Sequence, residues 1–214
     1  MPEYNIAVVA RAVAEAVPDR DYFVHGEVRL TYADMQDRAR RFGRYLVDQG
    51  FEVLRDRSEL ASHEIGQDTL GLYLHNGAEF LIANLGCFEA RAVPFNVNYR
   101  YVAEELTYLL HDSGARGLVY HSTFAETLAE VLEGITGPRT LIQVPDASNN
   151  PLLPGATWFD DALAASDPDP GVEPAPDDLY ILYTGGTTGM PKGVLWRQAD
   201  VYVSALGGRN RNTG

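Results

Sequence analysis

A segment rich in glycine and threonine is the part of the sequence whose residue types could do chemistry. Residues 183–194 read YTGGTTGMPKGV, with a single lysine. Glycines lack a Cβ, so neighbouring backbone N–H groups can approach an anion closely. Threonine hydroxyls add donors, and lysine adds a mobile positive charge. These residues together favour binding of a polyphosphate. The candidate ligands are Thr184, Gly185, Gly186, Thr187, Thr188, Gly189 and Lys192.

Two other interpretations of this segment are considered. One is a flexible turn between two strands, because Gly, Thr and Pro occur in ordinary loops. The other is a Walker-type loop, which needs Gly-Lys-Ser/Thr at the start of a helix. Here Lys192 follows Pro191 and precedes Gly193. Residues 179–183 and 194–196 both resemble strands, so the predicted context is strand, loop, strand, which does not suit Walker chemistry.

The elements that must position this loop are predicted to form an α/β fold with a mainly parallel sheet and flanking helices. Strands are predicted at 22–24, 28–30, 69–74, 92–97, 117–120 and 141–144. Helices are predicted from Asn5 to near Pro18 and over 31–50, 76–88, 103–111 and 123–132, with caps at Asn5, Thr31 and Asn76. Residues 54–67 are charged and aperiodic, which indicates a surface insertion. Strands that alternate with helices favour parallel pairing.

The chain is predicted to have three parts. Residues 1–166 form an amino-terminal α/β lobe. Residues 167–178 hold four prolines and five acidic residues, so little of this segment can be buried, and it is predicted to be a linker. Residues 179–214 are predicted to form the strand, phosphate loop and strand that begin a truncated remainder.

Composition limits the function classes. The 214 residues are 45% hydrophobic, which supports a packed core, and the formal net charge is −13. Such a charge gives no electrostatic footprint for nucleic acid or an anionic membrane surface. The lone Cys87 cannot form an internal disulfide, the start of the chain lacks signal-peptide features, and no apolar stretch is long enough to span a membrane. The predicted location is the cytoplasm.

The histidines give no metal site by their spacing, and no zinc site is predicted. They are His25, His63, His75, His111 and His121. Adjacent His121 and Ser122 lie near acidic residues, but neighbours in sequence do not provide the geometry of a Ser-His-Asp triad. No motif therefore supports a hydrolase.

A polar cluster is predicted at the carboxyl end of the strand over 92–97, where open α/β sheets bind ligands. It consists of Asn96, Asn98, Tyr99 and Arg100. A polar turn explains the same residues equally well. Tyr183 and Trp196 flank the glycine-rich segment, and both are predicted to support it from the strands rather than to contact a ligand.

Residues 183–193 resemble the phosphate-loop signature of the adenylate-forming superfamily, which contains acyl-CoA synthetases, luciferases and peptide-synthetase adenylation domains. The resemblance extends upstream through RLTYADMQDRARRFGRYL at 29–46 and RAVPFNVNYRYVAEELTYLLHDSGARGLV at 91–119. It covers essentially the whole chain. The Gly185-Gly186 pair, where serine is common at the first position, and the WRQ of 196–198 look most like actinobacterial fatty-acyl or steroid-side-chain CoA ligases.

The resemblance implies a two-step reaction of fatty-acid or lipid metabolism. A carboxylate attacks the α-phosphate of ATP to give an acyl-adenylate and pyrophosphate, and the thiol of CoA then displaces AMP. The full-length family uses ATP, Mg²⁺ and CoA, while this chain would contribute at most contacts to the ATP phosphates. The family's adenine, ribose, hinge and late lysine motifs are expected after position 214, so no catalytic residue is assigned within this chain.

The expected function is therefore the amino-terminal part of an ATP-dependent acyl-CoA ligase, inactive by itself. The alternative is a shortened, non-catalytic remnant that serves as a binding or interaction module. If part of the fold is missing, the strand over 179–183 should be left as an exposed edge, through which copies could associate.

Overall fold

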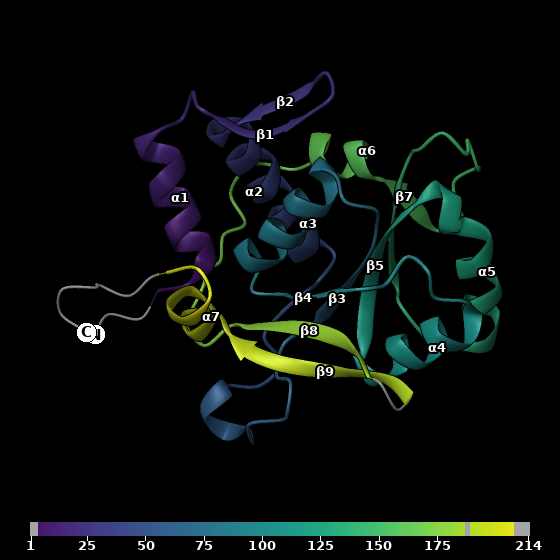
Figure 1. Ribbon diagram of the computed structural model, residues 1–214. Coiled ribbons are helices and arrows are strands. Elements are labelled where there is room, and N and C mark those ends of the chain that lie inside the picture. Colours follow the sequence, from purple (N-terminus) through teal and green to yellow (C-terminus); the bar gives the residue numbers. More distant parts are fainter. Residues whose placement is uncertain (1–3, 187–188, 208–214) are drawn as a thin grey trace.

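The computed structural model describes residues 4–186 and 189–207 (Figure 1). Its α-helices are α1 Ile6–Ala16, α2 Tyr32–Asp48, α3 Ala78–Glu89, α4 Ala103–Asp112, α5 Ala125–Gly134, α6 Phe159–Ala164 and α7 Gln198–Ser204, with 3-10 turns η1 Arg57–Glu59 and η2 Ser122–Phe124. Its strands are β1 Asp21–His25, β2 Val28–Thr31, β3 Thr69–Tyr73, β4 Val93–Asn96, β5 Ala115–His121, β6 Thr140–Val144, β7 Ala156–Trp158, β8 Leu179–Gly186 and β9 Gly189–Arg197.

The main sheet has the strand order β7-β6-β5-β3-β4-β8-β9. All neighbours pair in parallel except β8 and β9, which form an antiparallel hairpin. The predicted mainly parallel α/β fold is therefore confirmed. The chain passes from β3 to β4 on one side and later from β5 to β6 on the other, so connections diverge at the carboxyl ends of β3 and β5. The β1–β2 hairpin stands apart as a two-stranded sheet and turns at Gly26, whose φ is 57°.

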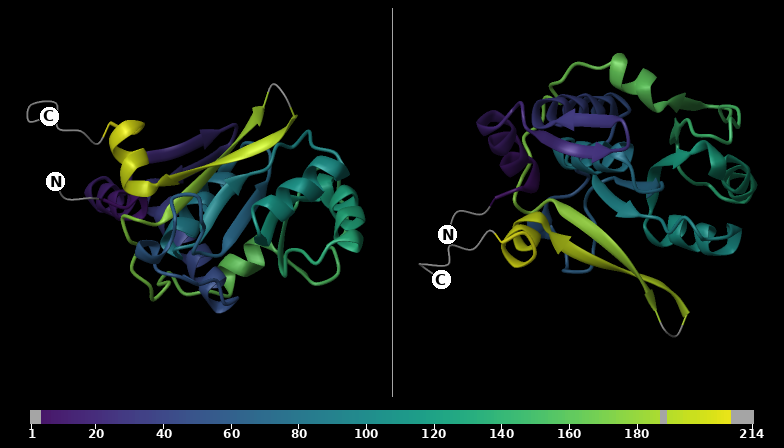
Figure 2. Two further views of the ribbon diagram at one scale, coloured as in Figure 1. Left: turned by 90° about the horizontal axis from the view of Figure 1, so that it is seen from below. Right: turned by 45° about the horizontal axis from the view of Figure 1, so that its top comes forward.

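Helices cover both faces of the main sheet (Figure 2). On one face α1, α2, α3 and α6 enclose a core with Leu70 and Leu72 of β3. On the other face α4 and α5 pack on Phe95 of β4 and Tyr120 of β5. Each face buries alternate residues of the same strands because successive side chains point to opposite sides. A sheet that is covered on both sides needs the apolar strands seen here.

The helix starts follow local rules in α2 but not in α3. Thr31 caps α2, and its side chain exchanges hydrogen bonds with Asp34 in a capping box. Helix α2 buries a stripe of Met35, Ala39, Phe42 and Leu46, spaced three or four residues apart. The predicted cap of α3 at Asn76 is wrong, because Gly77 occupies the cap position and no side chain caps it.

Helix α1 faces inward through small residues. Ala7 and Ala14 are buried, whereas Val13 is 38% exposed. The Asn5 side chain caps the helix by accepting from the Ala7 N–H at 2.7 Å. Its amide also donates to the Ala175 carbonyl at 2.8 Å. The start of the chain is thereby fastened to a segment 170 residues later.

Three elements were not expected from the sequence: β7, α6 and α7. Strand β7 adds an edge to the sheet beside β6, and α6 packs its Phe159 ring on Phe42 of α2 with ring centres 5.4 Å apart. The 54–67 segment holds only the short turn η1 and one bridge, between Val53 and Gln67. None of the helices formed by residues 4–186 and 189–207 combines the length and apolarity that a membrane crossing requires.

Candidate functional site

The glycine- and threonine-rich segment forms most of a β-hairpin rather than an open loop. Pairing of β8 with β9 runs from Leu179 opposite Arg197 to Gly186 opposite Gly189. The strands predicted at 179–183 and 194–196 are confirmed, but both are longer than predicted. Strand β8 continues to Gly186, and β9 begins at Gly189. The reason is cross-strand pairing, which brings backbone groups of residues 184 and 192 into the ladder.

The hairpin places two of the predicted ligands opposite each other. Thr184 pairs with Lys192, and both side chains are exposed. Gly185, Gly186 and Gly189 continue the strands beyond this pair. The predicted ligands Thr187 and Thr188 lie outside the described residues. A hydroxyl and an ammonium thus come from paired positions, next to glycines that lack a Cβ.

Pro191 fits within β9 because the ladder is irregular there. The register shifts between Thr184 and Gly186, while the opposite strand passes from Lys192 to Gly189. One extra residue therefore bulges on β9. Proline has no N–H to donate, so bulges and edge strands are the places in a sheet that accept it. Pro191 thus lies at the bulge beside the candidate ligands.

Tyr183 anchors the hairpin from its inner face. The residue is 8% exposed, its O–H donates to Asp112 Oδ2 of α4 at 2.7 Å, and its ring meets Phe95 edge-on at 5.8 Å. Burial, reinforced by the bond to Asp112, raises the pKa of Tyr183. Gly193 lies opposite, and a Cβ there would come within 3.0 Å of the Tyr183 ring. The predicted supporting role of Tyr183 agrees with this packing.

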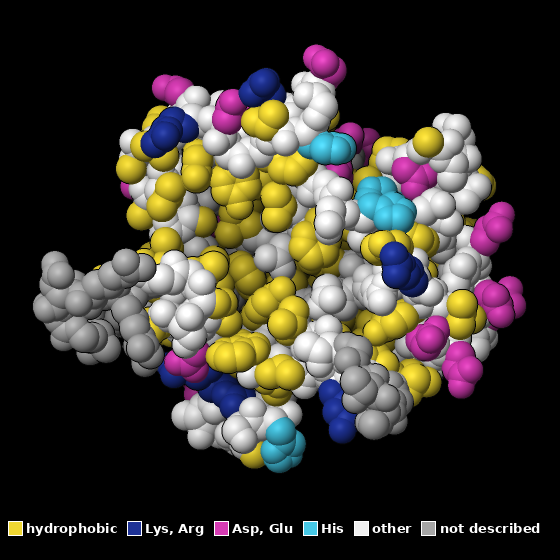
Figure 3. Space-filling view, viewed as in Figure 1, with side chains coloured by type: hydrophobic (Ala, Val, Ile, Leu, Met, Phe, Trp, Pro, Cys, Tyr) yellow, Lys and Arg dark blue, Asp and Glu magenta, His cyan; other side chains and the backbone are white. Residues whose placement is uncertain are grey.

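Trp196 does not share that role. It pairs with Tyr180 on the other face of the hairpin and is 39% exposed. Leu182 and Val194, at 39% and 42% exposure, form a cross-strand pair on the same side. Figure 3 shows hydrophobic side chains gathered over this part of the molecule, between α3 and the hairpin. We call Leu182, Val194 and Trp196 the outer apolar row.

The exposed edge of the sheet differs from the expected one. Strand β8 is paired on both sides, with β4 and with β9, so the prediction that residues 179–183 form an edge is wrong. Among the described residues the edge beside the hairpin is β9. The chain covers its own parallel strand by folding back after residue 186.

The polar cluster at the end of β4 divides into two roles. Asn96 Oδ1 accepts the Tyr183 N–H at 3.3 Å and so links β4 to β8. Asn98 Oδ1 accepts the Arg100 N–H at 3.0 Å within its own turn. Tyr99 is 45% exposed, and the Arg100 guanidinium lies 5.5 Å from its ring centre. The polar-turn interpretation accounts for Asn98, whereas Asn96 has a structural role between two strands.

A cavity of about 480 Å³ lies beside the hairpin, but on the Tyr183 side. Its wall includes His63, Asp112, Tyr183 and Leu195. Because Thr184 follows Tyr183 in a strand, its side chain points to the opposite face. The predicted phosphate ligands therefore do not line this cavity, and the chemistry of the hairpin, rather than the hollow, identifies the candidate site.

Asp178 joins the hairpin to the rest of the sheet. It is 1% exposed, and its carboxylate accepts from the Ala175 N–H at 2.7 Å and from the Arg91 guanidinium at 2.9 Å. Amides of Gln67 and Asn5 donate to it at 3.1 and 3.3 Å. Burial raises the pKa of Asp178, opposed by the bond from Arg91. We call these five residues the amino-end junction.

The junction corrects one expectation about residues 167–178. They contain no helix or strand, but the segment is held by its neighbours: Arg40 donates to the Pro168 carbonyl, and Asp178 is buried.

Arg91, which donates to Asp178, has a φ of 58° and so occupies the left-handed region, which costs an ordinary residue about 1–2 kcal/mol. No sequence signal separates Asp178 from exposed Asp177. The three-part division of the chain stays a prediction.

Two of the histidines come together at the carboxyl ends of the strands. His121 ends β5, and its Nδ1 accepts the His75 backbone N–H at 3.0 Å. The two rings lie 5.4 Å apart. Within the part of the chain that the structure describes, no group of three or more His, Cys, Asp or Glu side chains is placed to hold a metal ion.

Known protein families and curated relatives include clear matches to this chain. A family model described as AMP-binding enzyme matches residues 10–213. The medium-chain acyl-CoA ligase Mig of Mycobacterium avium is 53% identical over 212 residues, which cover 99% of this chain and 38% of that protein. A medium/long-chain-fatty-acid–CoA/3-oxocholest-4-en-26-oate–CoA ligase of Mycolicibacterium smegmatis is 40% identical, over 98% of this chain and 36% of its own length. The chain thus spans well under half the length of either relative.

Solved structures agree with these relatives. The anthranilate CoA ligase AuaEII, in complex with anthranoyl-AMP, matches with a TM-score of 0.81 over 96% of this chain and 37% of its own, at 19% identity, which is a likeness of fold. The inhibitor-bound N-terminal domain of FACL13 from Mycobacterium tuberculosis matches with a TM-score of 0.72 at 27% identity, over 92% of this chain and 45% of its own. From its parallel sheet, its glycine-rich hairpin and the family match over residues 10–213, the chain belongs to the AMP-binding enzyme family.

Proposed function

We propose that the β8–β9 hairpin binds the β- and γ-phosphates of ATP for an acyl-CoA ligase. The observation that carries the proposal is the pairing of Thr184 with Lys192, both exposed, at the glycine-rich end of the hairpin. Hydroxyl and ammonium groups are donors that suit phosphate oxygens. The full set of proposed ligands is Thr184, Gly185, Gly186, Thr187, Thr188, Gly189 and Lys192.

The negative charge of the molecule increases the importance of Lys192 for binding an anion. The chain carries a formal charge of −13, and Lys192 is its only lysine. Anionic ATP is repelled by such a surface at long range, so a local cation must compensate. Lys192 is exposed and forms no ion pair with a described carboxylate, which leaves its ammonium available for a ligand. The donor set therefore fits a polyphosphate.

The proposed reaction of the longer protein is formation of an acyl-adenylate from a carboxylic acid and ATP, followed by transfer to CoA. Fatty or steroid-side-chain acids are the proposed substrates, after the names of the relatives, and the cytoplasm is the proposed location. Mg²⁺ is expected to share the phosphate charge. The described residues supply no carboxylate cluster for that ion, so we assign it no ligand. Holding the leaving phosphates by preorganised donors is the contribution we assign to this chain.

We propose that the 214-residue chain does not complete adenylation by itself. Contacts to the phosphates supply only part of the transition-state stabilisation that a ligase needs. Residues for the nucleoside and the acid are not assigned within this chain. Release of pyrophosphate by the purified chain, with fatty acids and Mg·ATP present, would contradict this proposal.

The decisive experiment is calorimetric titration of the purified chain with Mg·ATP. Loss of a charge-assisted contact in Lys192→Ala should weaken binding by about tenfold to a hundredfold. Arg139→Ala is the matched control, since it removes one positive charge from an exposed loop position before β6. Because the chain has one lysine, ATP should also protect a single side chain from an amine-selective reagent. Equal affinities of both variants would refute the role of Lys192.

The alternative function, an interaction module, is favoured by the outer apolar row and the edge strand β9. We propose that copies associate through this edge, because an exposed apolar strand is a template for pairing. Val194→Lys should shift the chain toward monomer in sedimentation analysis. Val28→Lys on β2 is the control, since Val28 is 50% exposed on a separate hairpin. A chain that is monomeric at all concentrations would exclude this association.

A further inference from the structure

The carboxyl ends of β3 and β5 form the place where the connections of the sheet diverge. The chain leaves β3 toward β4 and leaves β5 toward β6, on opposite sides. In open α/β sheets such a divergence creates a crevice where ligands commonly bind. His75 follows β3 at this point, and His121 is the last residue of β5. A contact between these two residues therefore lies at the point of divergence.

That contact is a single hydrogen bond, and it requires one protonation state of the His121 ring. The His75 backbone N–H donates to Nδ1 of His121 at 3.0 Å. Nδ1 can accept only when it carries no proton, so the neutral ring must hold its proton on Nε2. A second proton would turn the acceptor into a donor and place two N–H groups face to face. Protonation of His121 thus breaks the contact.

Aromatic rings from the connections that follow β3, β4 and β5 lie around this hydrogen bond. The His75 ring lies 5.0 Å from the Tyr99 ring, after β4, and 5.0 Å from the Phe124 ring, after β5. Phe124 in turn stacks on Tyr73 at 4.2 Å. The turn that holds His75 leads directly into α3 through Gly77, which has no side-chain cap. Release of the bond would therefore free this turn from the end of β5.

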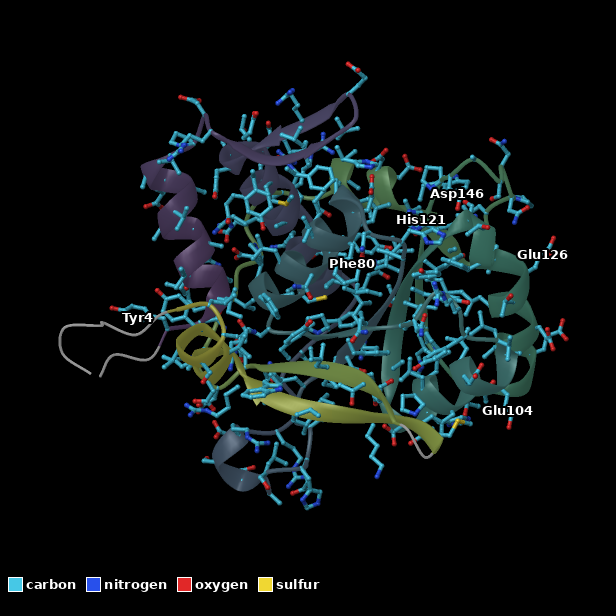
Figure 4. All side chains as sticks on the ribbon, viewed as in Figure 1. Tyr4, Phe80, Glu104, His121, Glu126 and Asp146 are labelled. Carbon is cyan, nitrogen blue, oxygen red and sulfur yellow. The ribbon has the colours of Figure 1, made fainter. Side chains whose placement is uncertain are left out.

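Charged and titratable neighbours set the proton affinity of His121 from several elements. Burial and the neighbouring His75 lower the pKa of His121, while Asp146 after β6 and Glu79 in the first turn of α3 oppose that shift. Figure 4 shows His121 and Asp146 close together at this end of the sheet. The net effect keeps the ring neutral at neutral pH, in the state that the hydrogen bond requires.

We propose that His121 is a proton-sensitive latch, which holds the turn after β3 against the end of β5 and opens as the pH falls below neutrality. The latch fixes the positions of His75 and Tyr99 beside the crevice when closed. Opening changes the exposure of both rings without unfolding the sheet. This device is independent of the proposed phosphate contacts, which lie on the β8–β9 hairpin.

The test is amide hydrogen exchange of the full 214-residue chain, followed by NMR as a function of pH. The His75 amide should be protected at pH 7, with His121 in the Nε2–H tautomer. As the pH falls from about 6.5 toward the lowered pKa of His121, the protection factor of His75 should fall by up to about tenfold per pH unit, and it should level off once the ring is protonated. The Val97 amide, which donates to the Leu72 carbonyl at 3.0 Å, should show no such dependence.

Two variants separate the latch from general stability. His121→Asn keeps an acceptor near the position of Nδ1 but cannot titrate, so protection of His75 should persist at low pH. His121→Phe removes the acceptor, so His75 should exchange rapidly at every pH while Val97 stays protected. The proposal is overturned if His75 remains protected in His121→Phe, or if its protection in the unmodified chain does not change with pH.

Discussion

The two ends of the parallel sheet are fastened in different ways. At the amino ends of β3, β4 and β8, Asp178 is 1% exposed and receives bonds from donors on three other segments and from the Ala175 N–H of its own segment. At the carboxyl ends, where β3 and β5 pair as far as Tyr73 opposite Tyr120, one bond to an imidazole holds the turn that follows β3. Buried charge-assisted bonds resist opening, whereas a bond to a titratable ring can be released by one proton. The amino end of the sheet is therefore fixed, whereas the turn at its carboxyl end responds to one proton.

The largest expected effect comes from breaking the fixed end. Asp178→Ala removes the acceptor of the amino-end junction and leaves the Arg91 guanidinium partly buried, at 31% exposure, without its carboxylate. The loss in unfolding free energy should be about 3 kcal/mol, at the lower end for a broken buried pair because Arg91 is partly exposed. Urea unfolding measures it.

Asp177→Ala is the matched control. Asp177 is adjacent in sequence, and it pairs with Arg197 while its side chain is 50% exposed. Surface pairs of this kind contribute less than about 1 kcal/mol. Equal losses in the two variants would show that the junction is no stronger than a surface contact, which would remove the contrast between the ends.

A smaller loss of unfolding free energy is expected for a substitution in the middle of the hairpin, between the amino-end junction and the candidate ligands. Gly193→Ala would bring a Cβ within 3.0 Å of the Tyr183 ring and 3.1 Å of Ile181. Crowding of a packed position should cost about 1–2 kcal/mol in thermal or urea unfolding. Gly134→Ala at the end of α5 meets no atom within 4 Å and should be neutral or stabilising. A tolerated Gly193→Ala would show that the hairpin is held from the junction alone.

The bond between Tyr183 and Asp112 permits a finer comparison, because a second tyrosine contacts the same carboxylate. Tyr183→Phe removes a 2.7 Å bond from a buried ring and should cost about 1 kcal/mol, since exposed Asp112 regains water. Tyr108→Phe removes an exposed 3.4 Å contact and should have little effect. Chemical denaturation of both variants measures the difference, and reversed magnitudes would refute the anchoring role of Tyr183.

The smallest effect should be opposite pH slopes from the two ends. The folded-state pKa of His121 lies below its ordinary 6.5, so the unfolded chain binds the proton first and the contribution of His121 is lost as the pH falls below about 6.5. The folded-state pKa of Asp178 lies above its ordinary 3.8, so its contribution is lost as the pH rises through that raised value. Subtracting the pH profiles of His121→Asn and Asp178→Asn from that of the unmodified chain should give slopes of opposite sign. Slopes of the same sign would contradict the opposite pH dependences assigned to His121 and Asp178.

Local signals in the sequence predicted most of the individual elements. The threonine cap and apolar stripe of α2 depend on residues within one helix, so the sequence contains all that is needed. The parallel sheet followed from the alternation of strands and helices. The cap of α3 was misassigned by one residue, because Asn76 and Glu79 match a capping pattern while the helix begins after Gly77.

The site was predicted in composition but not in shape. Residue types at 183–194 indicate phosphate chemistry, yet the extent of the hairpin depends on pairing across the chain, and so does the contrast between buried Tyr183 and exposed Trp196. Asp178 and Asp177 are chemically identical neighbours. Only the positions of Asn5, Gln67 and Arg91 make the first a buried junction, and no local pattern records them.

The bond between Asn5 and Ala175 has a consequence for how the protein is made. A ribosome adds about 5–20 residues per second, so the 170 residues between these partners separate their emergence by roughly 10–30 s. Throughout that interval α1 has neither its carbonyl partner nor Gln198, whose side chain accepts the Ile6 N–H at 3.2 Å. During synthesis, α1 can therefore pack on α2 and α3, where Arg11 pairs with Glu89, well before these two bonds fix its amino end.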